Sequence, residues 1–126
     1  MTTIKELAAE RYVSVTTFRK NGTGVPTPVW VAPDGEGLVV WTVASSGKVR
    51  RLRADPRVVL AACDVRGNTR GEQVEGRASV LPPDETERAR RLILRKYGLP
   101  ARLLMVISRF RRGEHGTVGV RIVGGA

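Results

Sequence analysis

The chain has 126 residues, a length that suits one domain able to bury an apolar core without disulfides. Its 22 Lys and Arg residues against 12 Asp and Glu give a net charge of +10. The lone cysteine, Cys63, excludes an internal disulfide, and together with a single histidine, His115, it forms no metal-ligand pattern, which argues against a metal enzyme. No apolar run has the length of a membrane span and the N-terminus lacks a signal-peptide pattern, so we expect a single-domain cytoplasmic protein over residues 1–126 with no membrane partner.

The positive charge is compatible with nucleic-acid binding, because clustered Lys and Arg release counterions from phosphates. Here the basic residues are mainly arginines spread over most of the chain. The chain also has only two Trp, two Tyr and two Phe, few for a base-stacking face. A basic nucleic-acid-binding barrel therefore stays an alternative of another class, and not the leading interpretation.

The order of elements follows from apolar periodicity and turn residues. In chain order we predict a helix over 4–10, strands over 12–18, 26–31 and 38–43, a helix over 48–54, strands over 58–65 and 73–80, helices over 82–98 and 101–112, and a strand over 117–123. Thr3 and Glu6 form a capping box for the first helix. Residues 21–24, Asn-Gly-Thr-Gly, predict a hairpin turn, and Pro26 and Pro28 place the returning strand at a sheet edge.

Short strands with few helices predict a fold that is mainly β with α additions. An antiparallel barrel with helices at its ends is the architecture that removes exposed sheet edges.

Residues 45–53, Ser-Ser-Gly-Lys-Val-Arg-Arg-Leu-Arg, join a strand to a helix. Free amides at a helix start, hydroxyls and several cations converge there, which is the chemistry of an anion site. The same arginines also fit a solvated helix face, and spacing alone does not decide between the two interpretations.

Two motifs carry a family resemblance: Pro-Val-Trp at 28–30, and Lys-Val-Arg-x-Leu-Arg-x-Asp-Pro-Arg at 48–57. With the runs 74–78 and 95–98, they resemble the pyridoxamine-phosphate-oxidase-like superfamily. More closely, they look like its actinobacterial branch that uses the deazaflavin coenzyme F420. The resemblance implies an antiparallel split β-barrel of the FMN-binding type and a homodimer with the cofactor groove at its interface.

Carried over by position, the resemblance implies that Lys48 and Arg53 bind the cofactor phosphate with help from Thr42 and Ser46. Val29 and Trp30 would line the ring, and Arg50 would reach an acidic tail. The remaining cofactor-binding candidates are Pro28 and Val49, which lie in the two motifs, and Glu75, beside a strand glycine that can mark the close approach of a ligand.

The implied activity is hydride transfer from reduced F420 to a small conjugated, electron-poor acceptor. FMN stays open as the cofactor of an oxidase or reductase, because both cofactors offer a phosphate and a tricyclic ring. Only F420 adds a polyglutamate tail, which the excess of arginine suits. A non-catalytic cofactor carrier or heme-binding protein is an alternative of another class, with His115 as its available histidine ligand.

Hydride transfer needs no dedicated catalytic side chain, since the protein mainly positions cofactor and acceptor. Tyr12, Tyr97 and His115 are proton-donor candidates between which the sequence does not choose. Trp30 and Trp41 on successive strands fit a core or a dimer contact as well as a ligand.

Overall fold

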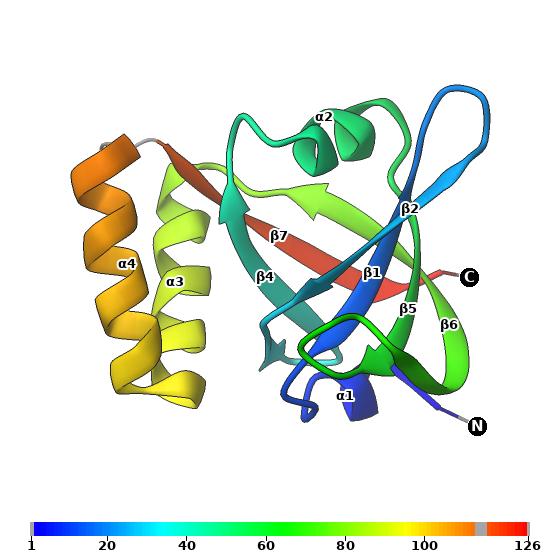
Figure 1. The fold of residues 1–126 in the computed structure, drawn as a ribbon, viewed down its shortest axis with the longest axis horizontal. Coiled ribbons are helices and arrows are strands. Elements are labelled where there is room, and N and C mark those ends of the chain that lie inside the picture. Colours follow the sequence, from blue (N-terminus) through cyan, green and yellow to red (C-terminus); the bar gives the residue numbers. More distant parts are fainter. Residues whose placement is uncertain (1, 113–115, 126) are drawn as a thin grey trace.

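The computed structural model describes residues 2–112 and 116–125, which form a seven-stranded antiparallel sheet with four helices (Figure 1). The elements are α1 (Ile4–Leu7), β1 (Val13–Phe18), β2 (Gly24–Val29), β3 (Val31–Asp34), β4 (Gly37–Val43), α2 (Gly47–Ala54), β5 (Arg57–Cys63), β6 (Thr69–Val80), α3 (Pro83–Tyr97), α4 (Leu99–Arg112) and β7 (Thr117–Gly124). The prediction of a mainly β protein with α additions is confirmed. Among the described residues, no helix is long and apolar enough to cross a membrane.

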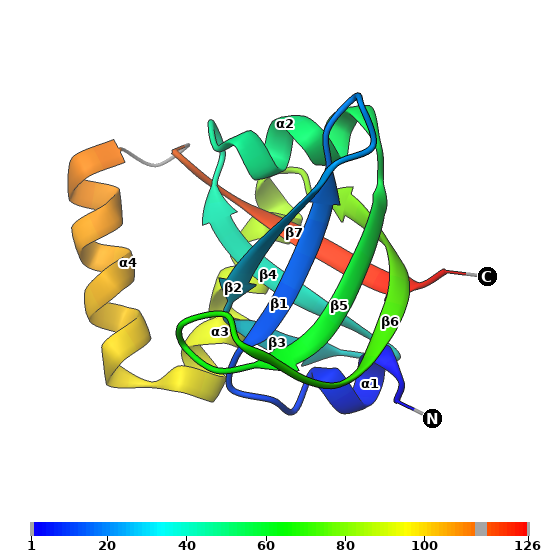
Figure 2. The same ribbon diagram turned by 45° about the vertical axis from the view of Figure 1, so that its right-hand side comes forward.

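The strands follow the order β2-β1-β5-β6-β7-β4-β3 around the barrel. Both edge strands, β2 and β3, are consecutive in the chain, so the barrel is split where the chain passes from one to the other (Figure 2). Pro26 and Pro28 lie on β2, opposite Thr16 and Ser14 of β1. The predicted edge position of these prolines is confirmed.

The barrel interior holds the main apolar core. Alternate residues of β4 and β7 point inward, including Leu38, Val40, Val120 and Ile122, and all four are almost fully buried. Each such side chain contributes about 1.5–3 kcal/mol of burial free energy. Helices α1 and α2 lie over opposite ends of the barrel (Figure 1).

A second apolar layer covers the outer face of β3, β4 and β7. There α3 packs through Ala89 and Ile93 against Val39 of β4. The approach is close at Gly119 of β7, where a Cβ atom would lie 2.9 Å from Cβ of Ala89. Helix α4 then packs on α3 through its buried Ala101 and Met105.

A buried carboxylate fixes α3 to the sheet. Asp34, at the end of β3, accepts hydrogen bonds from both terminal nitrogens of Arg88, one at 2.9 Å, and from Nε of Arg121 at 3.2 Å. The hydrogen bonds from Arg88 hold the pKa of Asp34 below its usual value. Arg88 is therefore held by this carboxylate.

The end of α3 is fixed by two consecutive side chains. Lys96 donates to the carbonyl oxygens of Ala8 (2.8 Å), Val31 (2.7 Å) and Glu10. The hydroxyl of Tyr97 accepts from the amide of Val31 at 3.0 Å and donates to the carbonyl of Arg11 at 2.7 Å. These contacts connect α3 to β3 and to the segment after α1.

Several element boundaries differ from the prediction, among them the start of β6, at Thr69 instead of residue 73. The first helix ends at Leu7 instead of residue 10, because the amides of Ala9 and Glu10 donate to carbonyls three residues back and not four. The predicted strand 26–31 is two strands, since pairing changes at Trp30 from β1 to β4.

Candidate functional site

The site begins at the start of α2, where Ser46 is the N-cap. The hydroxyl of Ser46 accepts a hydrogen bond from the amide of Val49 at 3.3 Å. Nε of Arg51 donates to the hydroxyl of Thr17 at 2.6 Å, which anchors α2 to β1. A Cβ atom at Gly47 would lie 2.8 Å from this guanidinium, so the glycine allows Arg51 to fold back over the first turn.

Lys48 points from α2 toward the barrel interior. Its Nζ lies 3.5 Å from Oγ1 of Thr42 on β4, and its stem lies among apolar residues that include Val29 and Leu52. Burial, and secondarily the charge of Arg51, lowers the pKa of Lys48 to about 8.

Lys48 has no ion-pair partner among the residues described. In the same part of the chain, the first-turn amides of Gly47 and Lys48 have no hydrogen-bond acceptor. A partly buried cation beside unbonded helix amides is destabilising when empty and favourable when an anion binds. The geometry therefore favours the anion-site interpretation.

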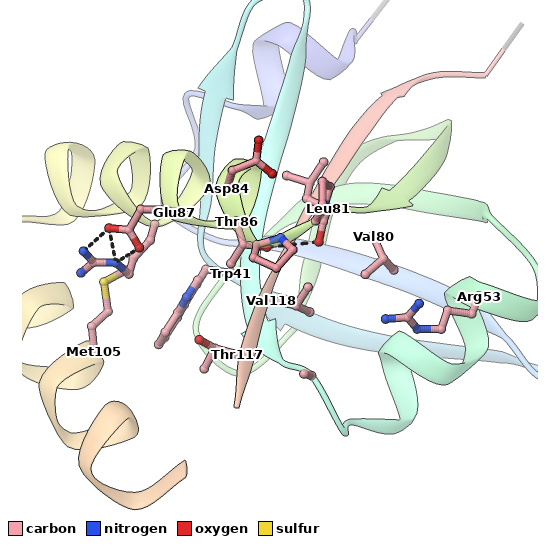
Figure 3. A pocket seen from close by; sticks show the side chains of 14 residues that line it. Trp41, Arg53, Val80, Leu81, Asp84, Thr86, Glu87, Met105, Thr117 and Val118 are labelled. Atoms are coloured by element: carbon pink, nitrogen blue, oxygen red, sulfur yellow. Dashed lines mark hydrogen bonds and ion pairs between the residues drawn. The ribbon is translucent and has the colours of Figure 1, made fainter. Parts of the chain in front are cut away.

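The rest of α2 is also strongly basic. Its eight residues include four basic side chains and no acidic one. Arg50 and Arg53 are exposed, and Arg53 projects toward a neighbouring cavity (Figure 3). Lys48 and Arg53 thus occupy separate positions, one facing the barrel interior and the other facing the cavity.

The cavity has a volume of about 860 Å³, within the range of small-molecule sites. It lies between α2, the ends of β4 and β6, the start of β7 and the two long helices (Figure 3). Its walls are apolar at Trp41, Leu81, Met105 and Val118 among others. The polar groups at its margin include Arg53 and the ion pair of Arg90 with Glu87, which contribute to its lining.

The sequence left Trp41, which lines this cavity, open between a core or dimer contact and a ligand contact. Its Nε1 is buried and has no hydrogen-bond partner in the described part of the chain. A buried donor without an acceptor costs about 1–3 kcal/mol, so this indole N–H destabilises the fold. The strand alternation of β4 is the signal available in the sequence, because it places Trp41 and Thr42 on opposite faces.

The residues expected to line the ring lie in different parts of the structure. Val29 is 9% exposed and adjoins Lys48. Trp30 lies in the outer apolar layer, where its ring stacks on that of Tyr97 at a centroid distance of 4.6 Å. Pro28 is exposed on the edge strand β2.

The structure also shows where two other cofactor-binding candidates, Val49 and Glu75, lie. The side chain of Val49 is buried in the core, and its amide is used by Ser46. Glu75 is exposed on β6, and the neighbouring Gly76 accommodates β7, because a Cβ there would lie 2.9 Å from the carbonyl oxygen of Val123. The close approach expected beside Glu75 is therefore made by the chain itself.

Cys63, Tyr97 and His115 are the remaining residues with reactive side chains that the sequence singled out. Cys63 is buried, and burial raises the pKa of its thiol, as expected of a core residue. The hydroxyl of Tyr97 is occupied by backbone groups. His115 lies outside the described residues.

Comparison with known protein families matches residues 2–125 to the model described as pyridoxamine 5'-phosphate oxidase. The chain belongs to this family. The match covers nearly the whole sequence, and the family is generally one of oxidoreductases. No match was found among curated proteins.

Solved structures agree with this family assignment. A conserved hypothetical protein from Mycobacterium tuberculosis superposes with a TM-score of 0.70 at 26% identity, over 95% of this chain and 76% of that one. An F420 reductase superposes with a TM-score of 0.64 at 22% identity, over 100% of this chain and 96% of that one. An FAD-binding protein from Mesorhizobium loti superposes with a TM-score of 0.64 at 19% identity, over 95% of this chain and 85% of that one. The split-barrel fold predicted from the motifs is confirmed.

Proposed function

We propose that this member of the pyridoxamine 5'-phosphate oxidase family is an F420-dependent oxidoreductase. It transfers hydride from the reduced deazaflavin to a small conjugated, electron-poor acceptor. The observation that carries the proposal is Lys48, a partly buried ammonium with no counter-ion in the described residues, in the first turn of a helix with two unbonded amides. The resemblance to an F420 reductase over the full chain supports the same cofactor class.

The cofactor phosphate would lie at the start of α2. Lys48 supplies its charge, the amides of Gly47 and Lys48 donate to the oxygens, and the hydroxyls of Thr42 and Ser46 lie beside them. Charge-assisted hydrogen bonds are worth roughly 1.5–3 kcal/mol each, so a few of them account for micromolar affinity after ordering costs. Val29 would line the ring, with Pro28 at the sheet edge, while Trp30 is braced by its stack on Tyr97.

The separation of Lys48 from Arg53 favours F420 over FMN. FMN carries one anionic group, whereas F420 carries a phosphate and the carboxylates of its tail. A ligand with two anionic regions satisfies both the inward-facing Lys48 and the outward-facing Arg50 and Arg53. FMN remains the second candidate, supported by an FAD-binding structural neighbour.

The acceptor would bind against the ring. When bound, reduced F420 supplies the hydride. The cavity shares no lining residue with the surroundings of Lys48 and Val29, so its apolar walls are not assigned to the acceptor. No side chain of the chain is assigned as a catalytic acid, because the hydroxyl of Tyr97 is already bonded to the backbone.

A homodimer with the cofactor groove at its interface is part of the proposal, and analytical ultracentrifugation tests it. The function is tested by titrating the purified protein with F420 and with FMN while following ligand fluorescence. We expect F420 to bind with a Kd below about 100 μM and more tightly than FMN. If neither binds in this range, the protein is not a cofactor-binding member of its family.

A further inference from the structure

An unusual apolar surface lies on α4. Among the described residues, six large hydrophobic side chains are exposed, and five of them belong to this helix. They are Leu99 (79% exposed), Leu103 (64%), Leu104 (48%), Val106 (59%) and Ile107 (45%). An exposed set of this kind marks an interaction surface.

Four of these side chains share one face of the helix. Leu99, Leu103, Val106 and Ile107 recur at intervals of three and four residues, and we call them the outer face of α4. The opposite side is the one that packs on α3. Figures 1 and 2 both show α4 at the margin of the molecule, beyond the barrel.

The sequence of α4 carries charge of a single sign, since residues 99–112 include four arginines and no Asp, Glu or Lys. Residues 88–113 contain eight arginines and one lysine and no Asp or Glu. Arg102 on α4, and Arg91 and Arg95 on α3, are exposed and have no ion-pair partner in the described part of the chain. An amphipathic helix with an aliphatic face and an arginine-rich surround has the composition of helices that lie in a membrane interface.

We propose that the outer face of α4 docks on the surface of an anionic lipid bilayer. The aliphatic side chains enter the boundary between head groups and acyl chains, and the arginines contact lipid phosphates. A second copy of the chain is disfavoured as the occupant, because a symmetric contact would bring two arginine-rich surfaces together without acidic partners. The inference goes beyond the proposed function and is independent of the cofactor.

Vesicle co-sedimentation tests the proposal with the full chain. The probes are vesicles of phosphatidylcholine alone and vesicles with about 30% phosphatidylglycerol. We expect wild-type protein to bind the anionic vesicles roughly fivefold more strongly than the neutral ones. The double variant Leu103→Gln/Val106→Gln should lose about tenfold of this binding, while its circular dichroism spectrum stays that of wild type, because both side chains are exposed.

Val65→Gln is the matched control, since Val65 is 63% exposed in the loop between β5 and β6. It should bind vesicles like wild type. Arg102→Gln keeps the apolar face and should reduce only the preference for anionic vesicles. The proposal is overturned if wild type does not prefer anionic vesicles, or if the double variant binds as well as Val65→Gln. It is also overturned if sedimentation velocity shows a wild-type dimer that the double variant dissociates, since a second copy would then cover this face.

Discussion

The ammonium of Lys48 lies 3.5 Å from the hydroxyl of Thr42, at the end of the barrel that α2 covers. The pair joins the first turn of α2 to the inward side of β4, one residue from the cavity-lining Trp41. A hydroxyl does not neutralise an ammonium, so the charge of Lys48 is left for a ligand. The predictions about binding follow from this arrangement.

The affinity for the cofactor should fall as pH rises above about 8. Burial lowers the pKa of Lys48 to about 8, and only its protonated form attracts a phosphate. The Kd should therefore rise up to about tenfold per pH unit above that value, until the pKa of the bound state is reached. Titrations between pH 7 and pH 10 measure this slope. Lys48→Arg, which stays protonated throughout, should abolish it; an unchanged slope would assign the titration to another group.

Arg53→Ala should discriminate between the two cofactors. If Arg53 contacts a second anionic region, its loss weakens F420 binding roughly tenfold, the equivalent of one charge-assisted hydrogen bond. FMN binding should change little. Parallel fluorescence titrations compare the two ligands, with Arg66→Ala, an exposed arginine of the β5–β6 loop, as the control. Equal losses for both ligands would instead place Arg53 at the shared phosphate.

Asp34→Asn should destabilise the fold by about 1–3 kcal/mol at pH 7, because it leaves Arg88 and Arg121 without their carboxylate. The folded-state pKa of Asp34 is lowered below 3.8, chiefly by Arg88, so its contribution is present above that value and is lost as pH falls through the folded-state pKa. Urea denaturation at pH 7 and near pH 3 measures the difference. A gap between wild type and variant that does not shrink in acid would contradict the assignment.

Tyr97→Phe tests whether the Tyr97 hydroxyl has a structural role or donates a proton in the reaction. The variant retains the stack on Trp30 but loses the hydrogen bonds with the amide of Val31 and the carbonyl of Arg11. We expect a loss of about 1–2 kcal/mol in unfolding free energy and an unchanged kcat for hydride transfer. A large fall in kcat with intact cofactor affinity would make Tyr97 the proton donor.

Local patterns in the sequence predicted the strands, the main helices and the family. The capping box at Thr3 and the edge prolines of β2 are each determined within a few residues, which is why they could be recognised. The motif at 48–57 likewise lies in one continuous segment.

What the sequence did not reveal depends on contacts between distant segments. Lys96 resembles a solvated lysine in the basic helix α3, yet it binds carbonyls 65 to 88 residues away. The cavity could not be predicted from the sequence for the same reason, since its walls come from α2, α3, α4 and three strands. Trp41 could be placed on the outer face of β4 by alternation, but its unbonded indole nitrogen depends on the packing of α3 and α4.

The F420 affinity of Lys48→Met, compared with that of Lys5→Met, tests whether Lys48 binds the cofactor phosphate. Lys5 is an exposed lysine at the opposite end of the barrel. The apo form of Lys48→Met should be more stable than wild type at neutral pH by roughly 1–3 kcal/mol, because a buried charge is removed, so lost binding would not reflect lost folding. We expect an F420 Kd at least roughly tenfold higher for Lys48→Met and unchanged for Lys5→Met. An unchanged Kd for Lys48→Met would contradict this expectation.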